Sequence, residues 1–303
     1  MSEPVYHVPV LLKEVIDGLN IRPNGVYVDC TFGGGGHSKE ILKRLDEQGV
    51  LIVFDQDADA KKNVPEDSRI LFVPNNFRHL QRFLRLHKVP AVDGIIADLG
   101  VSSHQFDEGA RGFSIRFDGD LDMRMDKRQE LTAYTIVKTY SEPQLHKMFE
   151  QYGEVTNSKT LARTVVQVRN TVSMKSIANF KEALHAVVKG NPNKYFAQVF
   201  QALRIEVNDE LGALKELLQQ IVIVLKPGGR AAIITFHSLE DRLVKIFFKN
   251  GNFEEDEPRD PFGQKIIKLP FTAITKKPIV PSEEELLRNS RSRSAKLRII
   301  EKL

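Results

Sequence analysis

Residues 31–38 place four consecutive glycines between a β-branched run and a segment with helical periodicity. Glycines let a backbone approach a ligand closely, and a helix start offers N–H groups, so this corner suits a nucleoside cofactor. Dinucleotide dehydrogenases favour G-x-G-x-x-G, but Ser38 stands where their third glycine belongs. Methyltransferases of the Rossmann-like class favour an acid ahead of the glycines, and Asp29 has that spacing. The loop therefore favours a methyltransferase over an NAD-type oxidoreductase.

Acidic side chains also follow two later apolar runs. Asp55 and Asp57 come 20 and 22 residues after Gly35, where an acid can hydrogen-bond the ribose hydroxyls of a cofactor. Asp98 closes the run 92–97, and ligands of open α/β sheets bind beyond the carboxyl ends of the strands. We expect Asp98 where cofactor and acceptor meet. The sequence leaves open whether it serves the cofactor or accepts a hydrogen bond from the target group.

Other side chains are candidates for contacts with a substrate. His237 closes the run 231–236 at the same predicted rim, and it either orients a substrate or is structural. Cys30 ends an apolar strand, so we expect an inert thiol. The run 288–298 holds five basic residues and no acid, which fits either a phosphate contact or a solvated face. Aromatic and basic residues that could stack on bases or contact phosphates also interleave in one segment: Phe106, Phe113, Phe117, Arg111, Arg116 and Arg124.

The elements that position these residues follow from periodicity. Apolar runs predict parallel strands at 26–30, 51–54, 70–73 and 92–97, with one helix capped by Ser38 and another at 80–86. The middle of the chain predicts a helix at 142–152 capped by Ser141, one at 159–168 capped by Ser158 and one capped by Ser176, with no strand among them. A single long helix from about 203 to 225 and a fifth strand at 231–236 then follow. We predict one domain over 1–105 and 202–303, and an inserted helical domain over 106–201.

The composition excludes several classes of protein. The 303 residues are 41% hydrophobic and carry a net charge of +4, and none of their apolar runs reaches the ~18 residues of a membrane span. The single cysteine excludes an internal disulfide framework and suits a reducing compartment. There is no Cys/His cluster with the spacing of metal ligands, so we expect no metal. We therefore predict a cytoplasmic protein that acts without a membrane.

Eight segments, in order along nearly the whole chain, resemble the MraW family of bacterial small-subunit ribosomal RNA methyltransferases. Two of them, Met-Arg-Met-Asp at 123–126 and Phe-His-Ser-Leu-Glu-Asp-Arg at 236–242, are especially specific in combination. Residues 194–199 and 170–175 depart from the family pattern. Both segments lie in or beside the predicted insertion, so the departures bear on how RNA docks and not on the cofactor site. The matching segments are 7–12, 29–38, 98–105, 111–114, 121–126, 200–205, 236–242 and 291–298.

The resemblance implies S-adenosylmethionine as cofactor and methylation of the exocyclic N4 of a cytidine in 16S rRNA of the small ribosomal subunit. It implies an α/β fold, a Rossmann-like class I methyltransferase sheet with an inserted all-helical subdomain for substrate recognition. A homodimer and the choice between naked rRNA and the assembled subunit stay open. Two other functions also stay open. One is an RNA-binding protein that keeps the cofactor-binding fold without catalytic activity, and the other is a methyltransferase that acts on DNA or protein. Asp98 and His237 are the catalytic candidates, and the implied cofactor contacts are Gly35, Gly36, His37, Asp55, Phe77, Asp98 and Gln105.

Overall fold

The computed structural model describes residues 9–255 and 268–303, so His7 and Val8 of the segment 7–12 lie outside the described residues. The chain divides into two compact units, Met1–Gly100 with Leu211–Leu303 and Val101–Glu210. These boundaries differ from the predicted 105/106 and 201/202. Helix α9 (Pro192–Asn208) runs unbroken through residue 201, and the chain turns only at Asp209, whose φ is 46°. The single long helix predicted from 203 to 225 is therefore wrong, because α10 (Glu210–Val224) is separate.

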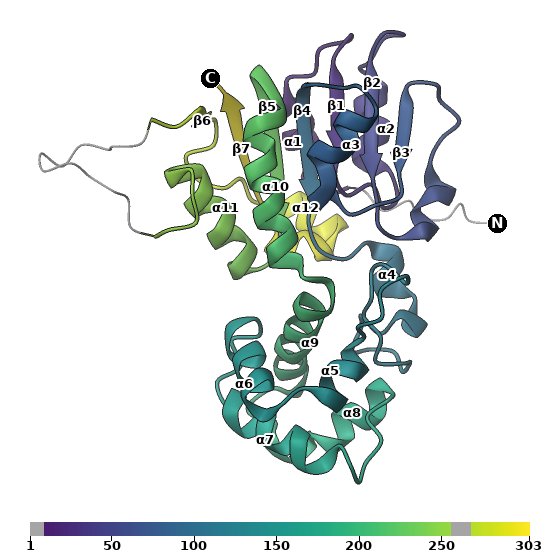
Figure 1. Ribbon diagram of the computed structural model, residues 1–303, viewed down its shortest axis with the longest axis vertical. Coiled ribbons are helices and arrows are strands. Elements are labelled where there is room, and N and C mark those ends of the chain that lie inside the picture. Colours follow the sequence, from purple (N-terminus) through teal and green to yellow (C-terminus); the bar gives the residue numbers. More distant parts are fainter. Residues whose placement is uncertain (1–8, 256–267) are drawn as a thin grey trace, which may run out of the picture. The chain divides into compact units, whose positions relative to one another are not determined.

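The first unit is built on a seven-stranded sheet with the order β3-β2-β1-β4-β5-β7-β6 (Figure 1). The first five strands are parallel, and β7 is antiparallel to both β5 and β6. This arrangement confirms the predicted class I methyltransferase sheet. The fifth strand begins earlier than predicted, at Leu225. The strands are β1 (Val26–Asp29), β2 (Val50–Phe54), β3 (Ile70–Val73), β4 (Val92–Asp98), β5 (Leu225–Thr235), β6 (Phe271–Ala273) and β7 (Lys296–Lys302).

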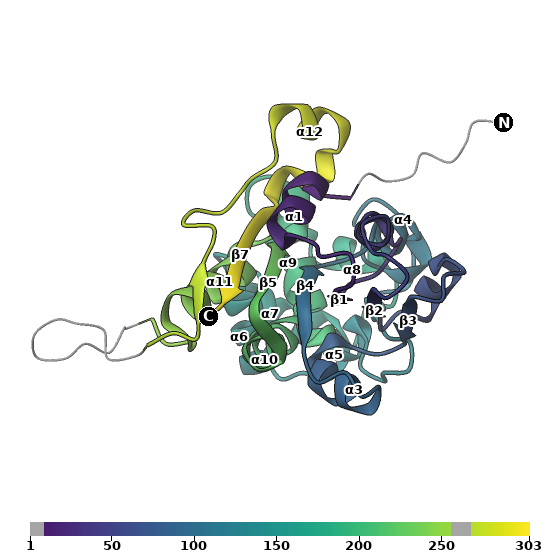
Figure 2. The same ribbon diagram turned by 90° about the horizontal axis from the view of Figure 1, so that it is seen from above.

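Helices cover both faces of this sheet (Figure 2). Alternate strand residues face opposite ways, so Tyr27 and Val28 of β1 belong to different hydrophobic clusters. Val28 packs in the cluster that includes α3, α10 and α11, and Tyr27 packs in the cluster that includes α1 and α2. The sheet is thus buried on both faces, which explains the continuous apolar runs of its strands. The remaining helices of this unit are α1 (Leu12–Leu19), α2 (Gly36–Leu42), α3 (Leu80–Leu86), α11 (Ser238–Asn250) and α12 (Glu283–Arg288), with short 3₁₀ helices η1 (Ala58–Asn63), η2 (Phe77–His79) and η5 (Ser290–Ser294).

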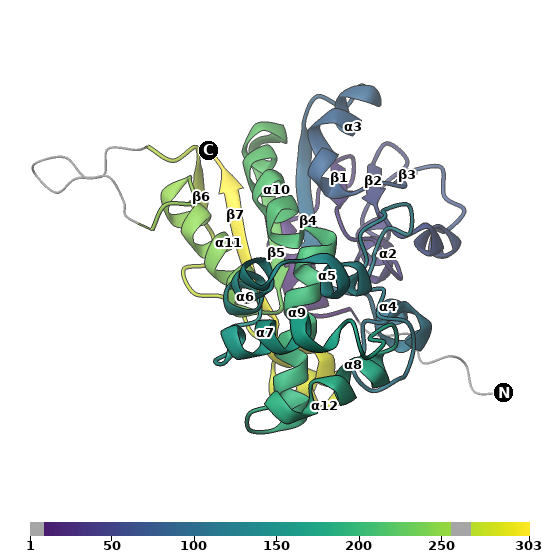
Figure 3. The same cartoon turned by 60° about the horizontal axis from the view of Figure 1, so that its bottom comes forward.

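The second unit is helical and has its own hydrophobic core. Its described residues hold no named strand, only an isolated bridge between Asp120 and Ser176. The three predicted helices are confirmed, and Ser141 and Ser176 cap two of them, whereas Ser158 is the first helical residue. Figure 3 shows α5 and α6 against α9, and both pack on that helix. The helices are α4 (Ser103–Asp107), α5 (Ala133–Thr139), α6 (Glu142–Gln151), α7 (Ser158–Val168), α8 (Ile177–Ala183) and α9, with 3₁₀ helices η3 (Gly109–Arg111) and η4 (His185–Val187).

Within the described part of the chain, no helix has both the length and the apolar character needed to cross a membrane.

Candidate cofactor site

The glycine loop follows β1 and is held by Asp29, the acid at its start. Ser38 does not cap the helix as predicted, because α2 begins at Gly36 and Gly35 is the N-cap residue. The Ser38 hydroxyl instead donates to Asp29 Oδ2 at 2.7 Å, and the Thr31 N–H donates to Asp29 Oδ1 at 3.0 Å. Asp29 is 2% exposed. Its carboxyl therefore ties the strand, the loop and the first turn of the helix together.

Two glycines of this loop are required by close approaches. Gly35 has φ 74°, and a Cβ there would come within 2.8 Å of the Phe32 ring. A Cβ on Gly36 would come within 2.2 Å of the Pro9 side chain. At Gly34 a Cβ would meet nothing within 4 Å. The loop is thus tightly packed beneath Gly35 and Gly36 and open at Gly34, which leaves room for a ligand beside its backbone.

Asp55 follows β2 and contacts the same loop. Its Oδ2 accepts the Gly33 N–H and its Oδ1 accepts the Asp57 N–H, both at 2.8 Å. Burial raises the pKa of Asp55 to about 6. A carboxylate offers about four lone-pair sites, so two remain for a ligand's hydroxyl groups. Asp57 instead caps η1, where its side chain accepts the Asp59 N–H.

Asp98 ends β4 next to the loop. Its backbone N–H donates to the Thr31 hydroxyl at 2.6 Å, which fixes the end of β4 against the loop after β1. Oδ1 of Asp98 is buried and finds no hydrogen-bond partner among the described residues. Burial, together with the charges of Asp29 and Glu240, raises the pKa of Asp98 to about 8. At pH 7 the carboxyl is therefore mainly protonated.

His37 faces Asp98 from the first turn of α2. Its Nε2 lies 3.0 Å from the Val10 carbonyl oxygen, which can only accept, so Nε2 carries the proton. The bare Nδ1 then points to Asp98, 3.8 Å from Oδ2. Burial lowers the pKa of His37 to about 4, so the ring is neutral at pH 7. The loop and β4 thus meet in a His–Asp pair that is mainly uncharged at pH 7.

His237 and Glu240 lie where β5 gives way to α11. His237 is the N-cap residue of α11, and its Nδ1 accepts the Glu240 N–H at 3.4 Å. Its Nε2 lies 3.2 Å from Glu240 Oε1, and Glu240 Oε2 accepts the Phe236 N–H at 2.8 Å. The structure thus places His237 in a capping position. Glu240, 2% exposed and close enough to raise the pKa of Asp98, was missed by the sequence reasoning, although it lies in the segment 236–242.

Comparison with known proteins decides the family. The sequence model described as "MraW methylase family" matches residues 4–303. The chain belongs to the MraW methylase family. Two curated relatives named "Ribosomal RNA small subunit methyltransferase H" are similar over almost their full length. The one from Bacteroides thetaiotaomicron is 56% identical over 99% of each chain, and the one from Parabacteroides distasonis is 55% identical over 100% of this chain and 99% of its own.

Solved structures show a more distant likeness. An rRNA methylase from Streptococcus thermophilus aligns over 99% of each chain, with 12% sequence identity and a TM-score of 0.42. The family assignment rests on the sequence comparisons and not on this alignment.

Two further cofactor contacts implied by the resemblance lie away from the glycine loop of this MraW family member. Phe77 begins η2, directly after β3, and packs partly buried against the sheet. Gln105 belongs to the helical unit, where it is 5% exposed and its side-chain oxygen accepts the Ser102 N–H in the capping box of α4. Gly35, Gly36, His37, Asp55, Phe77 and Asp98 all belong to the first unit.

Several basic residues that the sequence offered for phosphate contacts are structural in this family member. Arg298 is 8% exposed in β7, and its Nε donates to Asp241 Oδ1 at 2.8 Å. Lys296 Nζ binds the other oxygen of Asp241 at 3.0 Å. In the helical unit, Arg111 is 4% exposed and donates to main-chain carbonyls, and Arg124 forms an ion pair with Asp122 at 2.7 Å.

The aromatic residues of the segment 106–126 divide in the same way. Phe113 is 6% exposed and belongs to the core of the helical unit, so it cannot stack on a base. Phe117 is 45% exposed, and the neighbouring Arg116 is exposed too. Phe106 is partly buried, so Arg116 and Phe117 are the exposed members of the aromatic and basic set.

Proposed function

We propose that this chain transfers a methyl group from S-adenosylmethionine to the exocyclic N4 of a cytidine in 16S rRNA of the small ribosomal subunit. Membership of the MraW methylase family and the names of its relatives support the reaction class and the RNA substrate. The structural observation that carries the proposal is the buried Oδ1 of Asp98, without a hydrogen-bond partner among the described residues, beside the glycine loop.

The charges around this edge of the sheet fit the cofactor. Asp29 and Glu240, each 2% exposed, lie close enough to raise the pKa of Asp98, whose side chain is 25% exposed although its Oδ1 is buried. A positive ligand relieves their mutual repulsion, and a neutral or negative one does not. S-adenosylmethionine, when bound, supplies a methyl group on a positively charged sulfur.

Each predicted contact has a role in holding the cofactor. We keep the contacts of the Gly35 and Gly36 backbone with the cofactor as the resemblance implies them, with Phe32 and Pro9 fixing these two residues from within the protein. The two remaining lone pairs of Asp55 we assign to the ribose hydroxyls. His37 lies beside Asp98, with its Nδ1 3.8 Å from Oδ2, and adds no charge. Phe77 provides an apolar contact beyond β3. The contact at Gln105 stays an expectation from the resemblance.

Asp98 has the chemistry that methylation of an amine requires. The N4 lone pair of cytosine is delocalised into the ring, so an acceptor for the amine hydrogens is needed to draw it out of conjugation. A positive charge nearby lowers the pKa of Asp98, because it favours the carboxylate. The charge of the cofactor thus makes Asp98 a stronger acceptor for the amine hydrogens. His237 acts as a positioning residue, since it caps α11 and fixes Glu240 beside the site.

We assign substrate recognition to the helical unit, Val101–Glu210. A target base inside folded RNA must be unstacked before it can enter an active site, and a separate unit can hold the surrounding RNA while this happens. The basic and aromatic side chains on the surface of this unit include Phe117 and Arg116.

The test supplies the purified chain with tritiated S-adenosylmethionine and four acceptors: small subunits that lack the modification, free 16S rRNA, duplex DNA and ribosomal proteins. We expect label in the RNA and none in DNA or protein. Labelling of DNA or protein instead identifies one rival, and RNA binding without any transfer identifies the other. Asp98→Ala, which removes the acceptor, serves as the inactive variant.

A further inference from the structure

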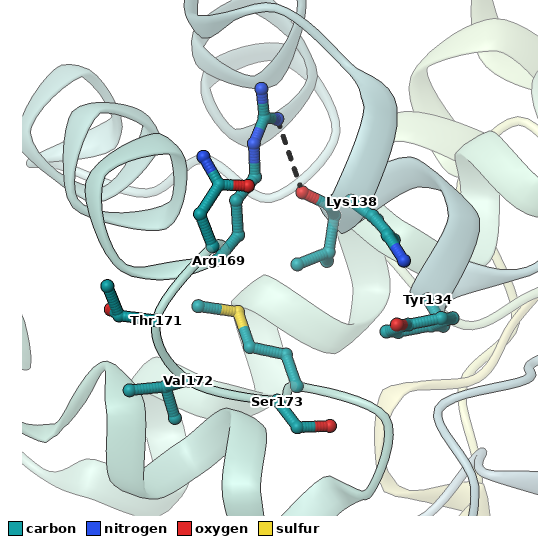
Figure 4. Close-up of a pocket in the computed structure, with 9 residues that line it drawn as sticks. Tyr134, Lys138, Arg169, Thr171, Val172 and Ser173 are labelled. Atoms are coloured by element: carbon teal, nitrogen blue, oxygen red, sulfur yellow. Dashed lines mark hydrogen bonds between the residues drawn. The ribbon is translucent and has the colours of Figure 1, made fainter.

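The helical unit contains a pocket of about 240 Å³ that no step of the proposed reaction uses. It lies between α5 and the loop that follows α7. Figure 4 shows Tyr134 and Lys138 across from the loop residues Thr171, Val172 and Ser173. The pocket is smaller than the roughly 300–1,000 Å³ typical of sites for drug-sized ligands, so it suits a single small group.

One wall of the pocket is aromatic and basic. The Tyr134 ring is partly buried, and Lys138 Nζ lies 5.6 Å from its centroid. The Lys138 side chain is exposed, and its flexible stem lets the ammonium move from the ring to a phosphate. Arg169 is fixed at the end of α7, because its Nη1 donates to the Tyr140 carbonyl at 2.6 Å.

The opposite wall offers an apolar floor and unused polar groups. Met174 is 2% exposed and closes the bottom of the pocket. The side chains of Asn170 and Ser173 are exposed and make no hydrogen bond to other residues in the part of the chain that the structure describes. The lining holds two cations, Lys138 and Arg169, and no acid.

We propose that this pocket binds one unstacked nucleotide of the RNA substrate, other than the cytidine that receives the methyl group. The base stacks on Tyr134, its edge faces Asn170 and Ser173, and Lys138 contacts a phosphate. Aromatic stacking combined with hydrogen bonds to base edges is how proteins read single-stranded RNA. The proposal rests on the proposed function, because it takes RNA as the substrate.

The stacking part is tested with Tyr134→Ala and Tyr134→Phe. Loss of base–aromatic stacking weakens binding of 16S rRNA by about 5- to 150-fold, and the phenylalanine variant keeps the ring and stays within about twofold of wild type. Since Tyr134 also packs against the core, thermal melting and S-adenosylmethionine affinity are measured for both variants. Equal RNA affinity in the two variants overturns the stacking role.

The phosphate part is tested with Lys138→Ala against Lys147→Ala. Both lysines are exposed on the helical unit, but Lys147, on α6, does not line the pocket. We expect Lys138→Ala to raise KM for the RNA substrate at unchanged kcat, and to reduce the salt dependence of binding by about 0.7 in log–log slope, the loss of one single-strand phosphate contact. The control changes neither. Identical behaviour of the two variants overturns the phosphate contact.

Photocrosslinking separates failure of the pocket from failure of the proposed function. 16S rRNA containing 4-thiouridine is irradiated with the full chain, and crosslinked peptides are identified. We expect crosslinks within 134–138 and 169–174. If wild type methylates RNA but no crosslink maps to these segments, the pocket assignment is wrong and the function stands. If the crosslinks form but no RNA is methylated, the function is wrong and the pocket stands as an RNA site.

Discussion

The protonation state of Asp98 predicts how cofactor affinity depends on pH. In the free protein the pKa of Asp98 is about 8, so the carboxyl is protonated below that pH. Binding of a cation favours the carboxylate, and the proton must then leave on binding. Affinity for S-adenosylmethionine therefore rises with pH up to about 8 and levels off above it. S-adenosylhomocysteine has the same amino-acid and ribose groups without the sulfonium charge, so its affinity lacks this part of the pH dependence.

The magnitude follows from the fraction of Asp98 that is ionised before binding. With a pKa of about 8, this fraction is roughly three quarters at pH 8.5 and roughly 3% at pH 6.5. If the bound state holds the carboxylate, affinity falls about 25-fold over this interval, which is about 1.9 kcal/mol. Asp55, whose pKa is about 6, titrates mostly below the interval.

Isothermal titration calorimetry measures this dependence for both ligands, with wild type and with Asp98→Asn. Subtracting the S-adenosylhomocysteine curve removes the titration of the shared amino group. We expect a wild-type difference of about 25-fold and a flat difference for the asparagine variant, which keeps the side-chain volume but cannot ionise. Proton release measured in buffers of different ionisation enthalpy gives an independent check. Parallel curves for the two ligands in wild type would refute the assignment of Asp98 to the cofactor's positive end.

Three further predictions concern the scaffold of the site. Asp98→Asn is expected to stabilise the fold at pH 8. Between pH 4 and 8 the unfolded chain has lost the proton that the native Asp98 carboxyl keeps, so the stability of wild type falls as pH rises, by at most ~1.4 kcal/mol per pH unit. Urea unfolding of both proteins at pH 5 and pH 8 measures this, and an equal difference in stability at the two pH values contradicts it. Ser38→Ala is expected to lower stability by about 1–3 kcal/mol and to weaken cofactor binding, because buried Asp29 loses a hydroxyl donor. Thermal melting and calorimetry measure the two effects, and an unchanged cofactor affinity would show that the hydrogen bond from Ser38 to Asp29 does not shape the loop. Arg298→Met is expected to lower stability by about 1–3 kcal/mol, because Asp241 loses the hydrogen bond from Arg298, and to leave the affinity for 16S rRNA unchanged. Weaker RNA binding by a variant that folds normally would restore the interpretation that Arg298 contacts phosphate.

Apolar runs predicted the strands of the first unit well, because a parallel sheet covered on both faces must be apolar along its whole length. The role of Ser38 could not be predicted, since its hydroxyl is engaged by Asp29 across the loop and the sequence shows only a good capping residue ahead of a helix. The break at Asp209 was equally hidden. Its φ of 46° ends α9, but the apolar positions continue in the same period through α10.

The candidate site was predictable in position and less so in detail. The strand-end rule located Asp55 and Asp98, because parallel strands present their carboxyl ends at one edge. The neighbours that set their chemistry come from elsewhere in the chain: Val10 fixes the tautomer of His37, and Glu240 raises the pKa of Asp98. Such contacts depend on tertiary packing, which spacing along a single sequence does not encode.

The central claim is tested most directly by nucleoside mass spectrometry. Small subunits that lack the modification are incubated with the chain and S-adenosylmethionine carrying a CD₃ group, and the 16S rRNA is digested to nucleosides. The proposed function predicts one CD₃ group per 16S rRNA, found in N4-methylcytidine, and none with the Asp98→Ala variant. Label on another atom, in another nucleoside or in none would contradict it.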